Sequence, residues 1–425
     1  MRERVDILLE HITTLVTMDA GAIPRRGPDA AQIGAVADGA VAIRGERIIA
    51  AGPSETVRRR FEGPAEATWD LDGCTVLPGF IDAHTHVLFA GSRESEFEMR
   101  LSGRSYMEIA AAGGGILSSV RAFREAHDDR LMAETRRRLD RMLCRGTTTV
   151  EAKSGYGLET NQEIRALRLI DRLSDAHPTD LLGTFLGAHD VGPEYRGSPD
   201  AYVRLIVEEM LPRVAAETRA RFCDVFCEKG VFTPEQARRI LVAAREHGLK
   251  PRLHADEFAP SGACELAAEL SALSADHLMA ATDEGLRALG QAPTVAILLP
   301  STSLSLRVRP YAPARKMIEM GIPIALASDC NPGSSMTTSL PLVLTLAVLE
   351  MGMTVAEALT AVTVNAAASL DLAAEVGRIG PGLRADLIVL GTPTPAAIIY
   401  HLGDLMPMRV LKAGRWVASE GEILS

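Results

Sequence analysis

Short apolar runs of strand length recur from about residue 75 onward, and stretches with helical spacing separate them. Eight runs follow this pattern: TVLPGFIDAHTHV, TTTVEAKSGYG, LLGTFLGAHDV, FCDVFCEK, KPRLHADEF, SADHL, TVAILLP and PIALASDCNPG. The stretches between them include LMAETRRRLDRMLCRG, TNQEIRALRLIDRLSDAH, TPEQARRILVAAREHG and APARKMIEMG. Eight strands that alternate with helices predict an α/β fold of the (β/α)₈ barrel type.

Both ends of the chain have the pattern of β structure instead. Apolar runs near the N-terminus are broken by turn signals at Arg44-Gly45-Glu46 and Asp72-Gly73, and Ala413-Gly414 marks a similar turn near the C-terminus. We expect the two terminal segments to pair into one small domain beside the barrel. The predicted boundaries are 1–77 and 373–425 for this β domain and 78–372 for the barrel.

Composition narrows the class of protein. The 425 residues carry a net charge of −10, which argues against nucleic acid or an anionic membrane as the main partner. No apolar stretch approaches the roughly 18 residues of a membrane span. Six cysteines without a pattern indicate a reducing, cytoplasmic location without disulfides. The longest interval between strands, after the first, contains Gly113 to Gly115, and we expect a flexible lid there.

Histidines and one aspartate stand where predicted strands end, which is where (β/α)₈ barrels place their active sites. His84 and His86 close the first strand, and their i, i+2 spacing turns both rings to one face. With His254 at the fifth strand and Asp329 at the eighth, they make a three-histidine, one-carboxylate set for a divalent metal. We expect Asp82 to orient one of the rings.

Three more side chains at strand ends are candidates for chemistry. Glu257, three residues after His254, is positioned to take a proton from a water and pass it to a leaving nitrogen, and Asp256 is the weaker candidate for this role. His277 is either a fourth nitrogen ligand or a hydrogen-bond donor to a developing oxyanion. His189, at the third strand, is a candidate for positioning the substrate.

These residues resemble the amidohydrolase superfamily. Longer strings are similar to the imidazolonepropionase family within it, namely DAHTHVLFAGSRESEFEMR, SYMEIAAAGGGI, EAKSGYGLE, FLGAHDVGPEY, DVFCEKGVF, LHADEF, SADHL and DCNPGSS. The match begins near Leu77 and runs almost to Ser425. The resemblance implies a TIM-like barrel with a small β-sandwich from both chain ends, one zinc or iron ion per chain, and a homodimer.

The resemblance also implies roles for single residues. The metal ligands would be His84, His86, His254 and Asp329. Glu257, His277 and Asp329 would be catalytic. The substrate contacts would be Arg93, Tyr156, His189, Asn331, Gly333 and Ser334.

Some positions depart from the family pattern. Where the family has an aromatic pair at the seventh strand, this chain has Leu304 and Ser305. Where the family has a phenylalanine, a proline and a tyrosine, this chain has Cys330, Met336 and Ala368, respectively. Lys153 and Lys229 follow strands but lie outside the strings of binuclear members, so we expect ordinary charged residues. The departures concern substrate preference and remove no ligand.

The residues predict a metal-dependent hydrolase of a C–N bond, and the resemblance supplies the substrate. The expected reaction opens the imidazolone ring of 4-imidazolone-5-propanoate to N-formimidoyl-L-glutamate, a step of histidine degradation. Arg93 would bind the propionate. Two alternatives remain at this stage, a cytosine- or guanine-type aminohydrolase, which releases ammonia, and an inactive barrel that serves as an interaction protein.

Overall fold

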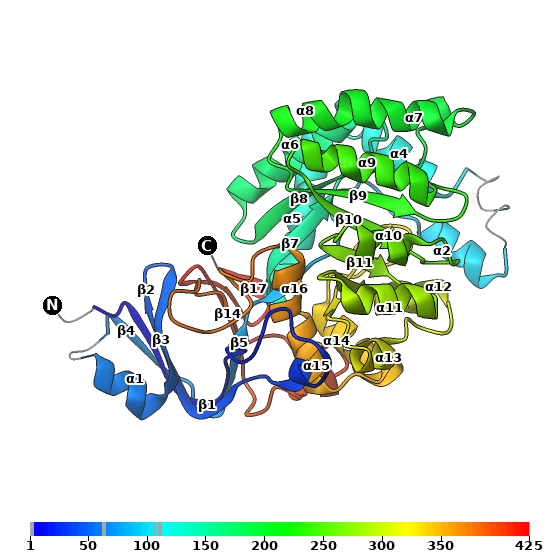
Figure 1. The fold of residues 1–425 in the computed structure, drawn as a ribbon. Coiled ribbons are helices and arrows are strands. Elements are labelled where there is room, and N and C mark those ends of the chain that lie inside the picture. Colours follow the sequence, from blue (N-terminus) through cyan, green and yellow to red (C-terminus); the bar gives the residue numbers. More distant parts are fainter. Residues whose placement is uncertain (1–3, 62–64, 105–107, 109–112, 425) are drawn as a thin grey trace.

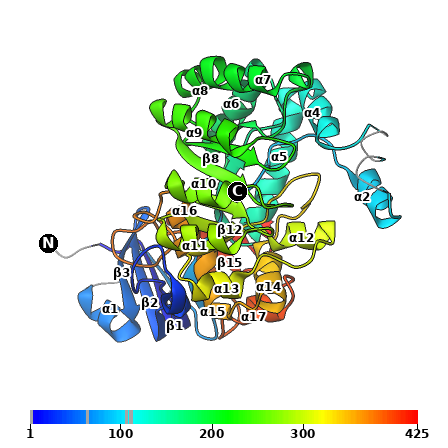
Figure 2. The same cartoon turned by 45° about the vertical axis from the view of Figure 1, so that its right-hand side comes forward.

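The computed structural model describes residues 4–61, 65–104, 108 and 113–424, and its centre is a barrel of eight parallel strands (Figures 1 and 2). Each of the eight predicted apolar runs contains one barrel strand, which confirms the predicted fold class. The strands are β6 (Phe80–Asp82), β7 (Thr147–Lys153), β8 (Asp180–Ala188), β9 (Phe222–Cys227), β10 (Lys250–Ala255), β11 (Ser274–His277), β12 (Val295–Leu298) and β13 (Ile324–Leu326).

The barrel closes just beyond the ends of its first and last strands. The backbone N–H of Asp329 donates to the His84 carbonyl at 3.0 Å, and that of His86 donates to the Cys330 carbonyl at 3.0 Å. These two bonds flank a parallel bridge between Thr85 and Cys330. The closure therefore brings together the His84–His86 segment and Asp329, which lie far apart in the sequence.

Helices separate the strands; most of them cover the outside of the barrel, and the first of them projects beyond it (Figures 1 and 2). They are α2 (Glu94–Leu101), α4 (Ile116–Glu125), α5 (Asp128–Cys144), α6 (Thr160–Ala176), α7 (Pro199–Leu205), α8 (Leu211–Glu217), α9 (Pro234–Glu246), α10 (Ala263–Glu269), α11 (Asp283–Gln291), α12 (Pro300–Leu306), α13 (Ala314–Glu319), α14 (Leu340–Met351), α15 (Val355–Ala361) and α16 (Val364–Ser369).

Helix α9 shows how local sequence sets these boundaries. Thr233 and Gln236 form a capping box at its start, and Pro234 occupies the first helical position, where its missing N–H costs nothing. The helix stops just before Gly248, which adopts a φ of 81°. Its buried Ile240 and Leu241 face the barrel, so the helix and strand β9 share one core.

The two chain ends form a second, mixed sheet of nine strands beside the barrel (Figure 1). Its strands are β1 (Ile7–Val16), β2 (Ala35–Arg44), β3 (Arg47–Pro53), β4 (Ala67–Asp70), β5 (Thr75–Pro78), β14 (Leu387–Leu390), β15 (Arg409–Lys412), β16 (Arg415–Ser419) and β17 (Glu422–Ile423). Trp69 and Trp416, from the two chain ends, meet edge to face with ring centroids 5.2 Å apart. The halves of this one sheet therefore face each other across a shared apolar core.

Only Gly79 separates β5, in the mixed sheet, from β6, in the barrel. Its N–H donates to the Asp386 carbonyl at 2.8 Å, and Lys412 forms ion pairs with both Asp180 and Asp386. These contacts fix the sheet to the end of the barrel opposite the site. Within the part of the chain that the structure describes, no helix combines the length and apolar character that a membrane crossing requires.

Sequence patterning missed some short helices. The interval after β6, predicted as a lid loop, contains α2 and α4, and α4 begins directly after Gly115. Helix α1 (Ser54–Arg60) lies in the N-terminal region, where only strands were predicted, and α17 (Ala397–Tyr400) lies near the C-terminus. Helices α1, α2 and α17 have only four to eight residues, too few to give a clear helical period, whereas the ten residues of α4 have an amphipathic pattern that was missed.

Candidate metal centre and active site

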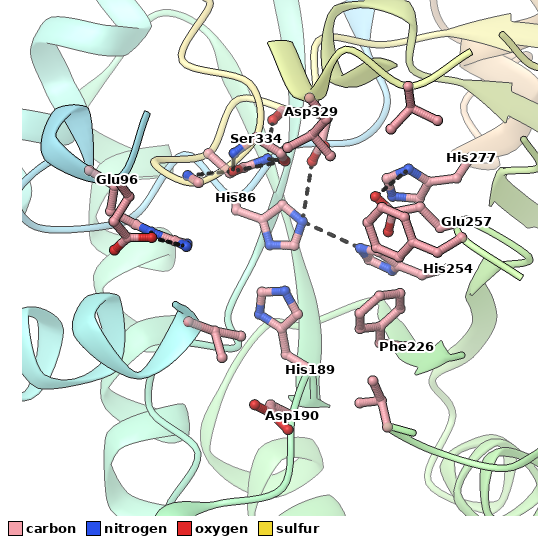
Figure 3. Close-up of a pocket in the computed structure, with 18 of the residues that line it drawn as sticks. His86, Glu96, His189, Asp190, Phe226, His254, Glu257, His277, Asp329 and Ser334 are labelled. Carbon is pink, nitrogen blue, oxygen red and sulfur yellow. Dashed lines mark hydrogen bonds and ion pairs between the residues drawn. The ribbon is translucent and has the colours of Figure 1, made fainter. Parts of the chain in front are cut away.

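Four of the predicted ligand atoms converge at the carboxyl end of the barrel. Asp329 Oδ1 lies 3.4 Å from both His84 Nε2 and His86 Nε2. His254 Nε2 lies 3.4 Å from His86 Nε2 (Figure 3). All four side chains are almost fully buried. A ring nitrogen of His277 also lies within 4.8 Å of those of His84 and His254, so His277 borders the same point.

This cluster fits a divalent metal. His84 Nε2 and Asp329 Oδ1 are buried without a hydrogen-bond partner, which is costly unless another group satisfies them. Four ligands at about 2.0–2.1 Å from one tetrahedral ion lie about 3.3 Å from each other, close to the separations observed. Burial lowers the pKa values of His84 and His86 well below the ordinary histidine value, which keeps both rings in the neutral form that binds metals.

Buried aspartates lie behind two of the ligand rings. His84 Nδ1 donates to Asp276 Oδ2 at 2.6 Å. This leaves Nε2 to face the metal point, which is the position on which the ligand atoms of His84, His86, His254 and Asp329 converge. His254 Nδ1 lies 3.1 Å from Asp224 Oδ2. The expectation that Asp82 orients a ring is wrong, because its Oδ1 accepts the backbone N–H of Ser328 at 2.9 Å and its Oδ2 is buried without a hydrogen-bond partner.

We expect Asp276→Asn to weaken metal binding by about 10–100-fold, the usual cost of losing a residue that orients a ligand. The change removes the negative charge that fixes the His84 ring. Competition with a chelator of known affinity measures the effect. The matched control is Asp82→Asn, which changes an equally buried aspartate without a ring contact and should leave the affinity close to wild type. Equal losses in both variants would show that burial of charge, not ring orientation, sets the affinity.

Glu257 and His277 stand beside the metal point on the side of β10 and β11. His277 Nδ1 lies 3.6 Å from Glu257 Oε1 (Figure 3). Burial raises the pKa of Glu257 well above its ordinary value, and the nearby negative charges of Asp329 and Glu228 raise it further. Burial lowers the pKa of His277, so this ring is neutral. A carboxylate that accepts protons readily beside a neutral imidazole suits proton transfer.

The backbone is strained where the strands deliver these groups. Asp256, His277 and Asp329 have φ values of 47°, 77° and 51°, in the left-handed region that residues other than glycine seldom adopt. Each lies at the end of a barrel strand or within three residues of it. Such strain clusters at functional sites, where the surrounding structure holds it in place.

A cavity of about 500 Å³ opens above the metal point. His189 stacks on His86 with ring centroids 4.8 Å apart, and its Nδ1 donates to the Gly155 carbonyl at 3.0 Å. Gly155 has a φ of 104°, and a Cβ there would lie only 3.0 Å from the His189 ring. The predicted substrate contacts all line this cavity, namely Arg93, Tyr156, His189, Asn331, Gly333 and Ser334.

Arg93 lies at one wall of this cavity and is paired. Its Nε and Nη2 donate to Glu96 Oε2 at 2.9 and 2.6 Å, while Nη1 lies so close to Gly333 that a Cβ there would clash with it. Glu96 also accepts the backbone N–H of Gly115, so the predicted lid segment is bound at that residue. Arg100 lines the same wall and donates to the Gly333 carbonyl at 3.1 Å.

The two lysines that follow strands, Lys153 and Lys229, have different surroundings. Lys229 is exposed, as expected of an ordinary charged residue. Lys153 is fully buried, and its Nζ donates to Glu151 Oε1 at 2.9 Å and Asp224 Oδ2 at 2.7 Å. Its amino group is therefore committed to two carboxylates.

The positions that depart from the family pattern have different surroundings. Leu304 and Met336 are exposed, and Ser305 and Ala368 are half-buried on α12 and α16. Cys330 is buried next to the ligand Asp329. None of the five lines the cavity, whereas Leu306 and Val308, just after the expected aromatic pair, do.

Several residues that shape the site were not predicted from the sequence. Asp276 bonds to the His84 ring and Asp224 lies 3.1 Å from the His254 ring. Thr302 donates to Asp329 Oδ2 at 2.7 Å, and Arg100 adds a second cation to the wall. The aspartates carried a usable signal, because each lies on a barrel strand at a position where an apolar residue is the rule. Asp276, for example, directly precedes His277.

Family comparison supports the class of protein that the barrel and the metal cluster define. The model of the amidohydrolase family matches residues 75–417. A second model, for the imidazolonepropionase-like composite domain of bacteria, matches residues 39–61, in the mixed sheet. The chain belongs to the amidohydrolase family, and the site is a divalent metal site of that family.

Curated relatives place the chain more narrowly. It is 49% identical to an imidazolonepropionase of Geobacillus kaustophilus over 420 residues, which cover 98% of this chain and 99% of the relative. It is 45% identical to an imidazolonepropionase of Alkaliphilus metalliredigens, covering 99% of this chain and 100% of the relative. Within the amidohydrolases, the chain therefore groups with the imidazolonepropionases.

Solved structures with the same fold are more distant in sequence. An adenosine deaminase from Xanthomonas campestris with bound zinc superposes with a TM-score of 0.75 at 17% identity, covering 100% of this chain and 95% of that one. An atrazine chlorohydrolase from Arthrobacter aurescens, complexed with zinc, gives a TM-score of 0.68 at 16% identity, covering 98% and 96%. These likenesses support the barrel with its attached sheet.

Proposed function

We propose that the protein hydrolyses the imidazolone ring of 4-imidazolone-5-propanoate to N-formimidoyl-L-glutamate, in the degradation of histidine. One observation carries this proposal. A single cavity has a metal-ligand cluster with Glu257 at its floor and two arginines, Arg93 and Arg100, at its wall. This arrangement suits a substrate with a hydrolysable ring at one end and a carboxylate at the other. The imidazolonepropionase relatives support the same assignment.

The ring-opening step follows from the groups at the floor of the cavity. His84, His86, His254 and Asp329 would hold a divalent ion, which would act as a Lewis acid and lower the pKa of a water toward about 7. Glu257 takes a proton from the attacking water, whose oxygen bonds to the ring carbonyl carbon. Glu257 then gives the proton to the ring nitrogen as the C–N bond breaks. His277 donates a hydrogen bond to the oxygen that gains charge.

We expect one tightly bound zinc or iron ion per chain. The two candidate ligand groups, His84–His254–His277 and His84–His86–Asp329, share His84, and His254 Nε2 of the first lies 3.4 Å from His86 Nε2 of the second, so both groups surround one point. Elemental analysis of purified protein should give close to one metal per chain. Two metals per chain would contradict the mononuclear site and require a bridging ligand. The homodimer expected from the family resemblance remains a prediction.

Arg93→Met should raise KM strongly and change kcat less. The guanidinium would contact the propionate, away from the carbon under attack, so it would stabilise the ground state and the transition state about equally. Removing one partner of a buried charge pair costs about 2–5 kcal/mol, of which the low end is roughly a 30-fold loss in kcat/KM. Steady-state kinetics on the natural substrate measure this loss.

A substrate analogue and a second variant make the Arg93 result specific. An imidazolone whose carboxylate is replaced by a neutral group should lose little in the Arg93→Met variant. Glu96→Gln leaves Arg93 in place without its partner and serves as the control for disruption of the pair. Equal losses on the charged and the neutral substrate would mean that Arg93 holds the wall of the cavity and does not bind the carboxylate.

Purified protein tests the proposed function directly. Addition of the protein should remove the ultraviolet absorbance of the imidazolone without releasing ammonia. Release of ammonia would favour the aminohydrolase alternative. Failure to change any imidazolone or aminated heterocycle, with the metal bound, would favour the inactive barrel.

A further inference from the structure

The loop that carries Glu257 is held by a second carboxylate, which the proposed reaction does not use. Glu228 directly follows β9, and only 4% of its surface is exposed. Its Oε2 accepts the backbone N–H of Glu257 at 2.9 Å and that of Phe258 at 3.0 Å. Its other oxygen accepts the N–H of Lys229 at 3.0 Å. Three backbone donors therefore fix the Glu228 carboxylate in one orientation.

The chain reverses direction at this place. Asp256, at the end of β10, adopts the left-handed φ of 47°, and its side chain accepts the N–H groups of Ser261 at 2.7 Å and Cys264 at 3.2 Å. These contacts hold the far side of the loop. The near side, where Glu257 begins, is held by Glu228 on the neighbouring strand.

The Glu257 side chain has little that holds it directly. Among the described residues, its nearest ionisable neighbour is the His277 ring, whose Nδ1 lies 3.6 Å from Oε1, beyond hydrogen-bond distance (Figure 3). The position of its carboxylate therefore depends on the position of its backbone. That backbone is bonded to Glu228 through its own N–H and the next one.

We propose that Glu228 is a positioning residue for the proton carrier, because it fixes the backbone from which the Glu257 carboxylate reaches the reacting atoms. Glu228 does not line the cavity and acts only through Glu257. The inference rests on the proposed function, in which Glu257 carries a proton from the attacking water to the ring nitrogen. A displacement of about 1 Å at a catalytic group costs about 10²-fold in rate, so the anchor matters for turnover.

Two conservative variants separate the reach of Glu228 from its charge. Glu228→Asp keeps the charge but shortens the side chain by one methylene, so the acceptor no longer meets both N–H groups. Glu228→Gln removes the charge but keeps an oxygen at the same distance. We expect Glu228→Asp to lower kcat by about 10²-fold with a smaller change in KM. Glu228→Gln should lower kcat by less than Glu228→Asp does, because its amide oxygen still meets the N–H groups of Glu257 and Phe258, although each bond is weaker and the bond from Lys229 is lost.

A readout independent of activity accompanies the kinetics. Hydrogen–deuterium exchange of a peptide spanning residues 255–260 should be faster in Glu228→Asp and close to wild type in Glu228→Gln. The control is Ser261→Ala, on the same loop, whose hydroxyl donates to Cys227 O at 3.1 Å and Asp256 Oδ1 at 2.7 Å. It loosens the far side of the loop and should leave kcat near wild type. Thermal unfolding and metal content confirm that each variant is folded and loaded.

The proposal is tested by comparing kcat and the exchange rate between the two Glu228 variants. Higher kcat and slower exchange in Glu228→Gln than in Glu228→Asp support it. The reverse order, or a kcat loss in Ser261→Ala equal to that in Glu228→Asp, overturns it. A wild-type protein that does not open the imidazolone ring contradicts the proposed function instead. In that case the exchange data alone still show whether Glu228 anchors Glu257, and equal exchange in all variants would overturn the anchor.

Discussion

Replacing Glu257 by glutamine should lower kcat by about 10²–10⁴-fold, the usual contribution of a general acid–base group. Glutamine keeps the shape of the side chain but takes no proton from water. The raised pKa of Glu257, caused mainly by burial, equips the wild-type carboxylate to accept that proton. Glu257 is not among the converging ligand atoms, so the metal content should stay unchanged. Turnover kinetics and elemental analysis on the same preparation measure both.

The control for Glu257→Gln is Glu246→Gln, at the exposed end of α9. It makes the same chemical change far from the cavity and should leave kcat at the wild-type value. Retained turnover in Glu257→Gln would move the proton-carrying role to Asp329 or His277. Loss of the metal in that variant would instead make Glu257 a ligand.

Lys153→Met should reduce the free energy of unfolding by about 3–5 kcal/mol, the cost of leaving buried charges without their partner. Burial alone lowers the pKa of Lys153, but Asp224 and Glu151 outweigh that effect, so the net pKa is raised and the lysine stays charged. The variant leaves both carboxylates unpaired in the barrel interior. Urea unfolding of the metal-loaded protein measures the difference.

Lys229→Met is the matched control for this stability prediction. Lys229 is exposed, and substitutions at such positions usually change stability by less than about 0.5 kcal/mol. A loss in Lys153→Met as small as that in Lys229→Met would mean that the buried carboxylates are neutral. The assignment of charges to Lys153, Glu151 and Asp224 would then be wrong.

The barrel could be predicted from sequence because its strands are buried on both faces. Strand β9, FCDVFC, and β12, VAIL, are nearly continuous apolar runs, as parallel strands covered by helices must be. The start and the end of helix α9 can be predicted from its capping box and from the glycine that follows it. The candidate ligands followed from the same pattern, since the ends of these strands meet at one edge of the barrel.

Contacts across the barrel interior could not be predicted in the same way. Asp82 is closer to His84 in sequence, but Asp276, 192 positions away, holds the His84 ring, because the side chains meet across the barrel interior. Arg100 was missed because a lone arginine on a short helix carries no pattern. The Glu96 partner of Arg93 lies three residues further on, where α2 turns it back toward the guanidinium.

The most direct test of the account is the identity of the product formed from 4-imidazolone-5-propanoate. Mass spectrometry of the reaction in water labelled with heavy oxygen should show a product heavier than the substrate by one water molecule. One labelled oxygen should lie in the new carboxylate, and no ammonia should appear in solution. A product that has lost nitrogen as ammonia, or a substrate left unchanged by the metal-loaded protein, would contradict hydrolytic ring opening at this site.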